Sequence, residues 1–149
     1  MTVALRAATG DDVDAIAEIE RACFSDPWSA ASFAGLLSGP RVRMTVAEDG
    51  GEVVGYSVLL LVPPDSDLAN FAVAPRAQRQ GTGRLLLGGV LAAARAEHVR
   101  HIYLEVRESN APAIALYEHA GFRQCGVRRR YYREPVEDAK VMRLDVISG

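Results

Sequence analysis

The chain has 149 residues, 49% of them hydrophobic, and this length and composition fit a single domain over residues 1–149 with a sizeable core. Its 17 basic and 19 acidic residues leave a net charge of −2, which argues against a general nucleic-acid or membrane-surface binder, because such proteins usually carry a marked basic excess. The first residues lack the apolar core of a signal peptide and the longest apolar run, residues 58–62, is too short to cross a bilayer, so we expect a cytoplasmic protein.

The cysteines and histidines do not have the spacing of a metal site. Cys23 and Cys125 lie far apart in the chain without a CxxC pattern, and we expect two reduced thiols. His98, His101 and His119 also lack ligand spacing. The sequence therefore predicts no metal.

In the N-terminal part, a short strand is followed by two helices. Residues 3–8 alternate enough to predict the strand, and Thr9 with the two aspartates that follow predicts the start of the first helix. Pro27 ends that helical pattern, and Ser29 can cap a second helix that runs to Leu37.

Three strands and a long helix are predicted next. Residues 41–47 and 53–62 are rich in β-branched and apolar residues, and the Gly-Gly turn between them indicates a hairpin. Residues 66–73 predict a third strand. Apolar residues at helical spacing then predict a helix over residues 81–97, although two interior glycines weaken it.

The C-terminal part predicts a strand, a helix and a hairpin. Residues 101–107 alternate as a strand, and Asn110 opens a helix that Gly121 ends. Residues 122–132 and 140–147 predict two long paired strands. The order of elements predicts a mixed α/β fold with one central sheet.

The stretch from Phe71 to Arg84 joins a strand end to a glycine turn and a helix start. Pro75 prevents the strand from continuing, while Gly81 and Gly83 let the backbone turn tightly and approach a ligand. The first N–H groups of a helix have no intrahelical partners and carry the positive end of its dipole. The stretch therefore suits a phosphate or pyrophosphate.

The residues around the glycines decide between kinds of phosphate site. A P-loop needs Gly-Lys-Ser/Thr, but Gly83 is followed by Arg84, and a dinucleotide motif needs a third glycine where Leu86 stands. Residues 78–83 (QRQGTG) instead resemble the pyrophosphate loop of the GNAT superfamily of N-acetyltransferases, which holds acetyl-coenzyme A.

A second stretch has the same resemblance. Residues 110–122 (NAPAIALYEHAGF) are similar to the Asn-x-x-Ala-x-x-Leu-Tyr-x-x-x-Gly-Phe motif that often follows the glycine loop in that superfamily. Together with residues 104–110 and 137–139, the chain resembles RimI-type ribosomal-protein-alanine N-acetyltransferases over residues 23–142. One departure is Val136, where relatives often have glycine. The resemblance implies the GNAT fold, an α/β architecture whose single mixed sheet is flanked by helices, with strands 4 and 5 splayed around the pantetheine arm.

The resemblance also implies which residues hold acetyl-CoA. Backbone groups of one strand end would meet the acetyl and pantetheine groups, the glycine loop would meet the pyrophosphate, and one asparagine that also suits a helix cap would contact the pantetheine. The residues concerned are Phe71, Ala72, Val73, Arg79, Gln80, Gly81, Thr82, Gly83, Arg84 and Asn110.

Acetyl transfer needs an amine without its proton and a proton for the thiolate that leaves. An α-amine has a pKa of about 7.7–8.0, so a modest base suffices. Glu105 interrupts an apolar strand and is the candidate base, with Arg107 as the cation that could lie beside it. Otherwise Glu105 is a solvated carboxylate on a polar strand face. Tyr117 resembles the general acid of the family; otherwise it is a core aromatic residue of its helix.

The acceptor is the part of the reaction that the sequence determines least. In N-terminal acetyltransferases, residues equivalent to Trp28, Tyr131 and Tyr132 flank the peptide, and the RimI resemblance implies the N-terminus of a ribosomal protein or another alanine-first protein as the partner. Glu137 and Asp138 could attract basic residues further along such a peptide. Two alternatives remain open: a GNAT enzyme that acetylates a small-molecule amine, and an acyl-CoA-binding regulatory domain without turnover.

Overall fold

The computed structural model describes residues 2–146, and its centre is a seven-stranded sheet in the order β1-β2-β3-β4-β5-β7-β6. The apolar and β-branched runs of the sequence form these strands. Their bounds are β1 Val3–Ala7, β2 Val42–Asp49, β3 Glu52–Val62, β4 Asp65–Val73, β5 His101–Arg107, β6 Arg123–Tyr132 and β7 Glu137–Asp145.

The helices lie where the caps and breakers of the sequence predict them. Ser29 Oγ accepts a hydrogen bond from the N–H of Ser32 and caps the second helix, and Gly121 ends the last helix with φ of 110°. A 3-10 turn, η1 (Gly10–Asp12), precedes the first helix. The helices are α1 Val13–Cys23, α2 Ala30–Leu37, α3 Thr82–Ala96 and α4 Ala111–Ala120.

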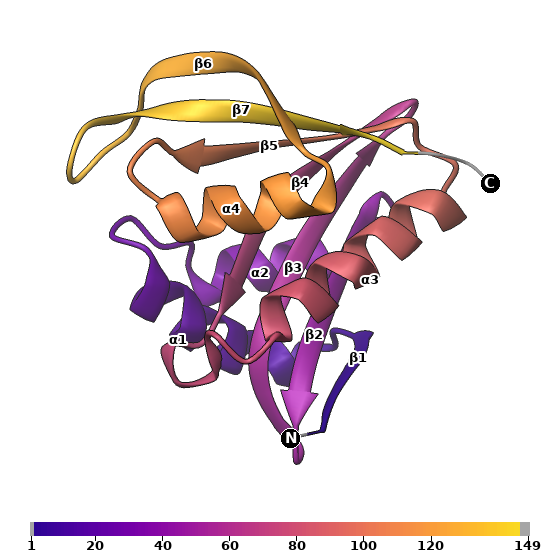
Figure 1. Ribbon diagram of the computed structural model, residues 1–149. Coiled ribbons are helices and arrows are strands. Elements are labelled where there is room, and N and C mark those ends of the chain that lie inside the picture. The colour runs from indigo at the N-terminus through magenta and orange to yellow at the C-terminus, as the bar shows by residue number, and fades with distance from the viewer. Residues whose placement is uncertain (1, 147–149) are drawn as a thin grey trace.

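The sheet is divided between β4 and β5. All neighbouring strands pair antiparallel except these two, which are parallel and pair only from Asp65 with His101 to Asp67 with Tyr103. β5 continues along β7 while β4 continues along β3, so the two strands diverge, as Figure 1 shows. Mixed α/β with splayed strands 4 and 5 is the predicted fold class, and it is confirmed.

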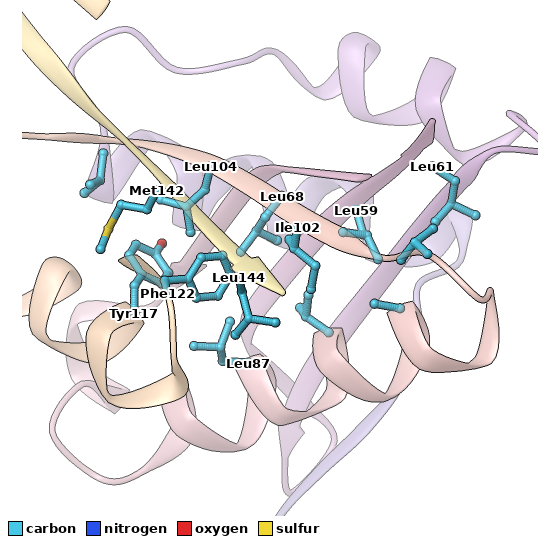
Figure 2. Packing of buried hydrophobic residues seen from close by; sticks show 14 residues of the cluster. Leu59, Leu61, Leu68, Leu87, Ile102, Leu104, Tyr117, Phe122, Met142 and Leu144 are labelled. Carbon is cyan, nitrogen blue, oxygen red and sulfur yellow. The ribbon is translucent and has the colours of Figure 1, made fainter. Parts of the chain in front are cut away.

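Helices cover both faces of the sheet. α1 and α2 pack on one face of β2–β4 around Ile16, Phe33 and Tyr56, all fully buried. α3 and α4 cover the other face, as Figure 1 shows, and their cluster extends over β5 and β7. Figure 2 shows this second cluster, in which Tyr117 of α4 lies beside Phe122. Because this cluster contains residues of both halves, it joins them where the hydrogen-bonded ladder stops.

The start of β7 differs from the sequence prediction. β7 begins at Glu137, three residues earlier than predicted, because Tyr132 pairs with Glu137 across the hairpin. The predicted end of that strand at Ile147 lies outside the described residues.

The two interior glycines of α3 have different surroundings. A Cβ at Gly89 would come within 2.7 Å of Leu5 on β1, so glycine permits this helix to pack closely there. A Cβ at Gly88 would meet nothing within 4 Å.

Candidate active site

The glycine loop leads from the end of β4 to the start of α3. A single 3-10 turn, η2 (Pro75–Ala77), follows the strand, and both Arg79 (φ 64°) and Gly81 (φ 84°) adopt the left-handed conformation. Leu85 donates the first helical hydrogen bond to Gly81 O at 3.1 Å. The N–H groups of residues 82–84 therefore precede the helical ladder and lie at the positive end of α3, which suits a pyrophosphate.

Two neighbouring residues of this turn have separate roles. The Oγ1 of Thr82 is buried and finds no hydrogen-bond partner within residues 2–146, so it is a polar atom that a ligand oxygen at the loop could satisfy. A Cβ at Gly83 would come within 3.3 Å of the Leu116 side chain on α4. Gly83 thus lets α3 and α4 pack closely, in addition to any approach to a ligand.

The last residues of β4 turn alternate backbone groups toward the gap. Ala74 donates to Val54 O on β3 at 2.8 Å, and the β3–β4 register is regular from Asn70 onward. Because backbone groups alternate along a strand, the N–H groups of Phe71 and Val73 point away from β3, into the space that β5 has left. Those of Ala72 face β3. Three residues are predicted to offer backbone groups to the acetyl arm, and the N–H groups of two of them, Phe71 and Val73, therefore face the gap.

Tyr117 lies on the α4 side of the gap. Its ring packs edge to face against Phe71 of β4, at 6.0 Å between centroids, and against Phe122, at 5.7 Å. Its hydroxyl makes no hydrogen bond with any described residue. Burial raises the pKa of Tyr117, and the neighbouring Tyr132 phenol raises it further, so the phenol keeps its proton near neutral pH.

Glu105 lies on the opposite face of the sheet. Leu104 and Val106 are buried in the α3–α4 cluster, whereas the Glu105 side chain is 24% exposed and accepts a hydrogen bond from Arg128 Nε at 3.0 Å. Arg107, predicted as the cation beside it, contacts Glu137 instead, at 3.1 Å, and the sequence-based pairing is therefore wrong. The cause is register: Arg107 is opposite Ala139 near the start of β7, which brings its guanidinium to the hairpin end.

The aromatic residues predicted for the acceptor lie in two segments, the end of β6 and the loop between α1 and α2, which we call the two walls. Tyr131 and Tyr132 at the end of β6 pack edge to face at 5.0 Å, and Arg107 stacks on Tyr132 at 4.5 Å. Trp28, in the loop between α1 and α2, packs on Phe33 at 5.5 Å.

Polar contacts connect the two walls. Arg133 of the hairpin pairs with Asp26 of the loop at 3.0 Å, and Arg107 donates to Ser25 at 3.3 Å. Glu137, predicted to attract a basic peptide, already accepts from Ser109 and Arg107, and these hydrogen bonds, the Ser109 hydroxyl first, lower its pKa.

Asn110 acts as a cap in the structure. Its Oδ1 accepts from the N–H of Ala113 at 3.3 Å at the start of α4, and its Nδ2 is unused among residues 2–146. The helix-cap interpretation is therefore confirmed. The predicted contact with the pantetheine stays a prediction.

A buried polar group behind the Trp28 loop is not predicted from the sequence. Glu20 of α1 is 2% exposed and accepts hydrogen bonds from Tyr56, Asn70 and the backbone of Trp28. The available signal was position: Glu20 lies one turn after Ile16 on the apolar stripe of α1, where a carboxylate needs partners.

The described part of the chain offers neither a metal site nor a membrane-spanning helix. Residues 2–146 contain no group of three His, Cys, Asp or Glu side chains arranged to hold a metal ion. None of the described helices is long and apolar enough to span a membrane.

Comparisons with known proteins agree with this arrangement. Residues 13–122 match the Acetyltransferase (GNAT) family. The chain is 41% identical to the N-alpha-acetyltransferase RimI of Mycobacterium tuberculosis, over 96% of this chain and 92% of that protein, and 37% identical to the ribosomal protein bS18-alanine N-acetyltransferase of Escherichia coli, over 91% and 92%. The crystal structure of the ribosomal-protein-S18-alanine N-acetyltransferase from Escherichia coli superposes with a TM-score of 0.90 at 34% identity, covering 99% of this chain and 97% of that chain. This chain therefore belongs to the GNAT family of acetyltransferases and is an N-acetyltransferase with acetyl-CoA as its cosubstrate.

Proposed function

We propose that this protein acetylates the N-terminal α-amine of an alanine-first protein, a ribosomal protein in the cytoplasm, by direct transfer from acetyl-CoA within one domain. The observation that carries the proposal is the position of two side chains: Glu105 and Tyr117 lie on opposite faces of the sheet beside the divergence of β4 and β5. A base on one face and an acid on the other suit an amine and a thiolate that meet in the gap.

The residues of the gap and the loop fit acetyl-CoA. The N–H groups of residues 82–84 and the unpartnered Thr82 hydroxyl would hold the pyrophosphate, with Arg79, Gln80 and Arg84 around it. The N–H of Val73 would hold the acyl arm, together with the N–H of Phe71 where a ligand replaces its contact with Asn70 Oδ1. Acetyl-CoA supplies an acetyl group activated as a thioester.

Glu105 would accept the proton of the α-ammonium, directly or through water, before the nitrogen attacks. An α-amine with a pKa of about 7.7–8.0 is mostly protonated at neutral pH, so a nearby acceptor increases the reactive fraction. Arg128 holds Glu105 at 3.0 Å but is itself 58% exposed, so water or an incoming ammonium can replace it at little cost.

Tyr117 would give its proton to the sulfur that leaves. The burial that raises its pKa keeps the phenol protonated, but it also opposes loss of that proton. Negative charge that develops on the sulfur in a low-dielectric site would offset this cost.

The two aromatic walls support a peptide acceptor. Trp28 on one side and Tyr131 and Tyr132 on the other present ring faces and hydroxyls that can bracket an extended backbone. The relatives named above act, by their names, on an α-amine or on the alanine of a ribosomal protein, which supports the same acceptor here.

Initial rates with three peptides test the proposal. We expect kcat/KM to be highest for a peptide that begins with alanine and continues with arginines, lower for one that begins with methionine, and lower for one with acidic residues after the alanine. Rates measured while both substrates vary should give the intersecting pattern of a direct transfer. Tandem mass spectrometry of the product identifies the acetylated atom.

Two results would contradict the proposal. Equal kcat/KM for all three peptides would remove the specificity for alanine, and faster acetylation of free polyamines or amino acids than of any peptide would assign the enzyme to small amines. A parallel-line pattern would replace direct transfer with a covalent enzyme intermediate.

A further inference from the structure

A buried carboxylate connects the Trp28 loop to the central strands. Glu20 Oε2 accepts the backbone N–H of Trp28 at 2.9 Å, while Glu20 Oε1 accepts from Asn70 Nδ2 of β4 at 2.8 Å and from the Tyr56 hydroxyl of β3. No cation pairs with Glu20 among residues 2–146. The three donors alone satisfy the Glu20 carboxylate. Burial of a carboxylate without a cation is costly, and the hydrogen bonds that offset this cost are strongly directional.

Its two ends have different surroundings. Tyr56 is fully buried between α1 and the sheet, and Asn70 lies where the β3–β4 register shifts. Asn70 Oδ1 also accepts the N–H of Phe71 at 3.2 Å, one of the two N–H groups that face the gap. By contrast, Trp28 is half-buried in a loop that runs from Phe24 to Ser29 without regular structure. Oε1 therefore contacts the central strands, whereas Oε2 contacts the Trp28 loop.

We propose that Glu20 is a positioning residue for the acceptor, which sets the distance of the Trp28 wall from the end of β4. It does not touch the reacting atoms. It acts through the Trp28 backbone on one side and Asn70 on the other. The inferred effect of Glu20 on acceptor binding rests on the proposed peptide acceptor. The inferred effect of Glu20 on the Trp28 loop does not.

Glu20→Gln tests the inference. The amide oxygen remains opposite two donors, Tyr56 and Asn70, so the amide NH₂ takes the place of Oε2 and faces the N–H of Trp28, donor against donor. We expect KM for the peptide to rise roughly tenfold, the effect of losing one hydrogen bond to a charged acceptor, while KM for acetyl-CoA changes less than about twofold. A purely structural role would lower the active fraction and therefore kcat, without moving KM.

The environment of the loop can also be measured directly by fluorescence, because Trp28 is the only tryptophan of the chain. Release of the loop in Glu20→Gln should shift the fluorescence emission to longer wavelength and increase quenching by acrylamide, with no acceptor present. Tyr56→Phe is the matched control: it removes another donor from the same carboxylate but leaves the Oε2 contact with Trp28. We expect it to lower the melting temperature and to leave the emission and the peptide KM unchanged.

The possible outcomes separate the two proposals. If the wild-type enzyme acetylates no peptide, the proposed function fails, and the emission shift still decides whether Glu20 holds the Trp28 loop. If Glu20→Gln is folded and keeps the wild-type emission and KM, or if Tyr56→Phe moves both as far as Glu20→Gln does, the positioning role is wrong. Should Glu20→Gln not fold, Glu20→Asp keeps the charge but is one methylene shorter and cannot span both ends, so the same shifts are expected.

Discussion

The two sides of the gap between β4 and β5 are built from different parts of the chain. On the side proposed for acetyl-CoA (the acetyl-CoA side), the groups available to a ligand are mostly backbone N–H groups, at the start of α3 and at the end of β4. On the side proposed for the acceptor (the acceptor side) they are side chains: Trp28, Glu105, Tyr131 and Tyr132, which come from three separate segments. A backbone site needs a local conformation, whereas a side-chain site needs segments brought together by the fold. The first should therefore tolerate substitution of its side chains, and the second should not.

The largest expected effect is that of Tyr117→Phe, which removes one oxygen on the boundary between the two sides. If its phenol protonates the leaving sulfur, kcat falls by a factor of about 10²–10⁴ at saturating substrates, with KM for acetyl-CoA nearly unchanged. Tyr103→Phe on β5 is the control, and should keep the wild-type kcat. A full rate for Tyr117→Phe, with chemistry shown to be rate-limiting, would make Tyr117 a packing residue only.

Glu105→Gln should affect only the acceptor side. We expect a loss in kcat of about 10²-fold below roughly pH 7 that shrinks above about pH 8, where the α-amine loses its proton without help. Affinity for acetyl-CoA should stay constant. A pH-rate profile compares this variant with Glu108→Gln, an exposed carboxylate three residues further on. A loss that is the same at every pH would mean that Glu105 does not act as a base.

Gly81→Val should affect only the acetyl-CoA side. With φ of 84°, any side chain at this position strains the loop and moves the first N–H groups of α3. We expect acetyl-CoA to bind about tenfold more weakly or worse, measured by calorimetry. Gly88→Ala, in the helix that follows and with open space around it, is the control and should be neutral or stabilising. Unchanged affinity of Gly81→Val would mean that the phosphates bind elsewhere. Gly83→Val is a less specific test, because it would also disturb the contact with Leu116.

The smallest expected effect concerns an ion pair far from both sides. Arg6 contacts the buried Asp12 at 2.7 Å, and its hydrogen bonds lower the pKa of Asp12. Because the folded pKa lies below the unfolded value of about 3.9, this stabilisation is present above that pH and is lost as the pH falls through the folded pKa. Asp12→Asn should destabilise by about 1–3 kcal/mol near neutral pH and by less in acid, with kinetic constants unchanged. Thermal unfolding against pH checks this. The exposed Asp14→Asn should not reproduce it.

The local structure of the acetyl-CoA side could be predicted from the sequence, and the difference in construction explains why. The glycines, the strand end and the helix start are consecutive, so the loop from Val73 to Arg84 is visible as one motif, and the helix begins within one residue of the prediction. The same holds for caps such as Ser29 and Asn110, where the partner lies three residues away. Local hydrogen bonds leave local signatures in the sequence.

The acceptor side could be predicted only in part. The alternation of β5 correctly predicts the face on which Glu105 lies, but its cation depends on the register of two other strands, and Arg128 replaces the expected Arg107. Glu20 could not be connected with Asn70, because fifty positions of sequence separate two residues that meet only after the sheet forms. Such pairings are properties of the whole fold.

The short pairing of β4 with β5 gives the sheet an internal edge. The amide of Val73 lies near the middle of seven strands, but it faces no neighbouring strand. Its hydrogen should therefore exchange with solvent as quickly as that of an outer strand, while the amides of Ala72 and Ala74, bound to β3, exchange slowly. Unpaired strand edges usually invite association with another chain, and here helices on both faces restrict access to this one. Slower exchange at Val73 would then serve as a residue-specific signal that acetyl-CoA has bound.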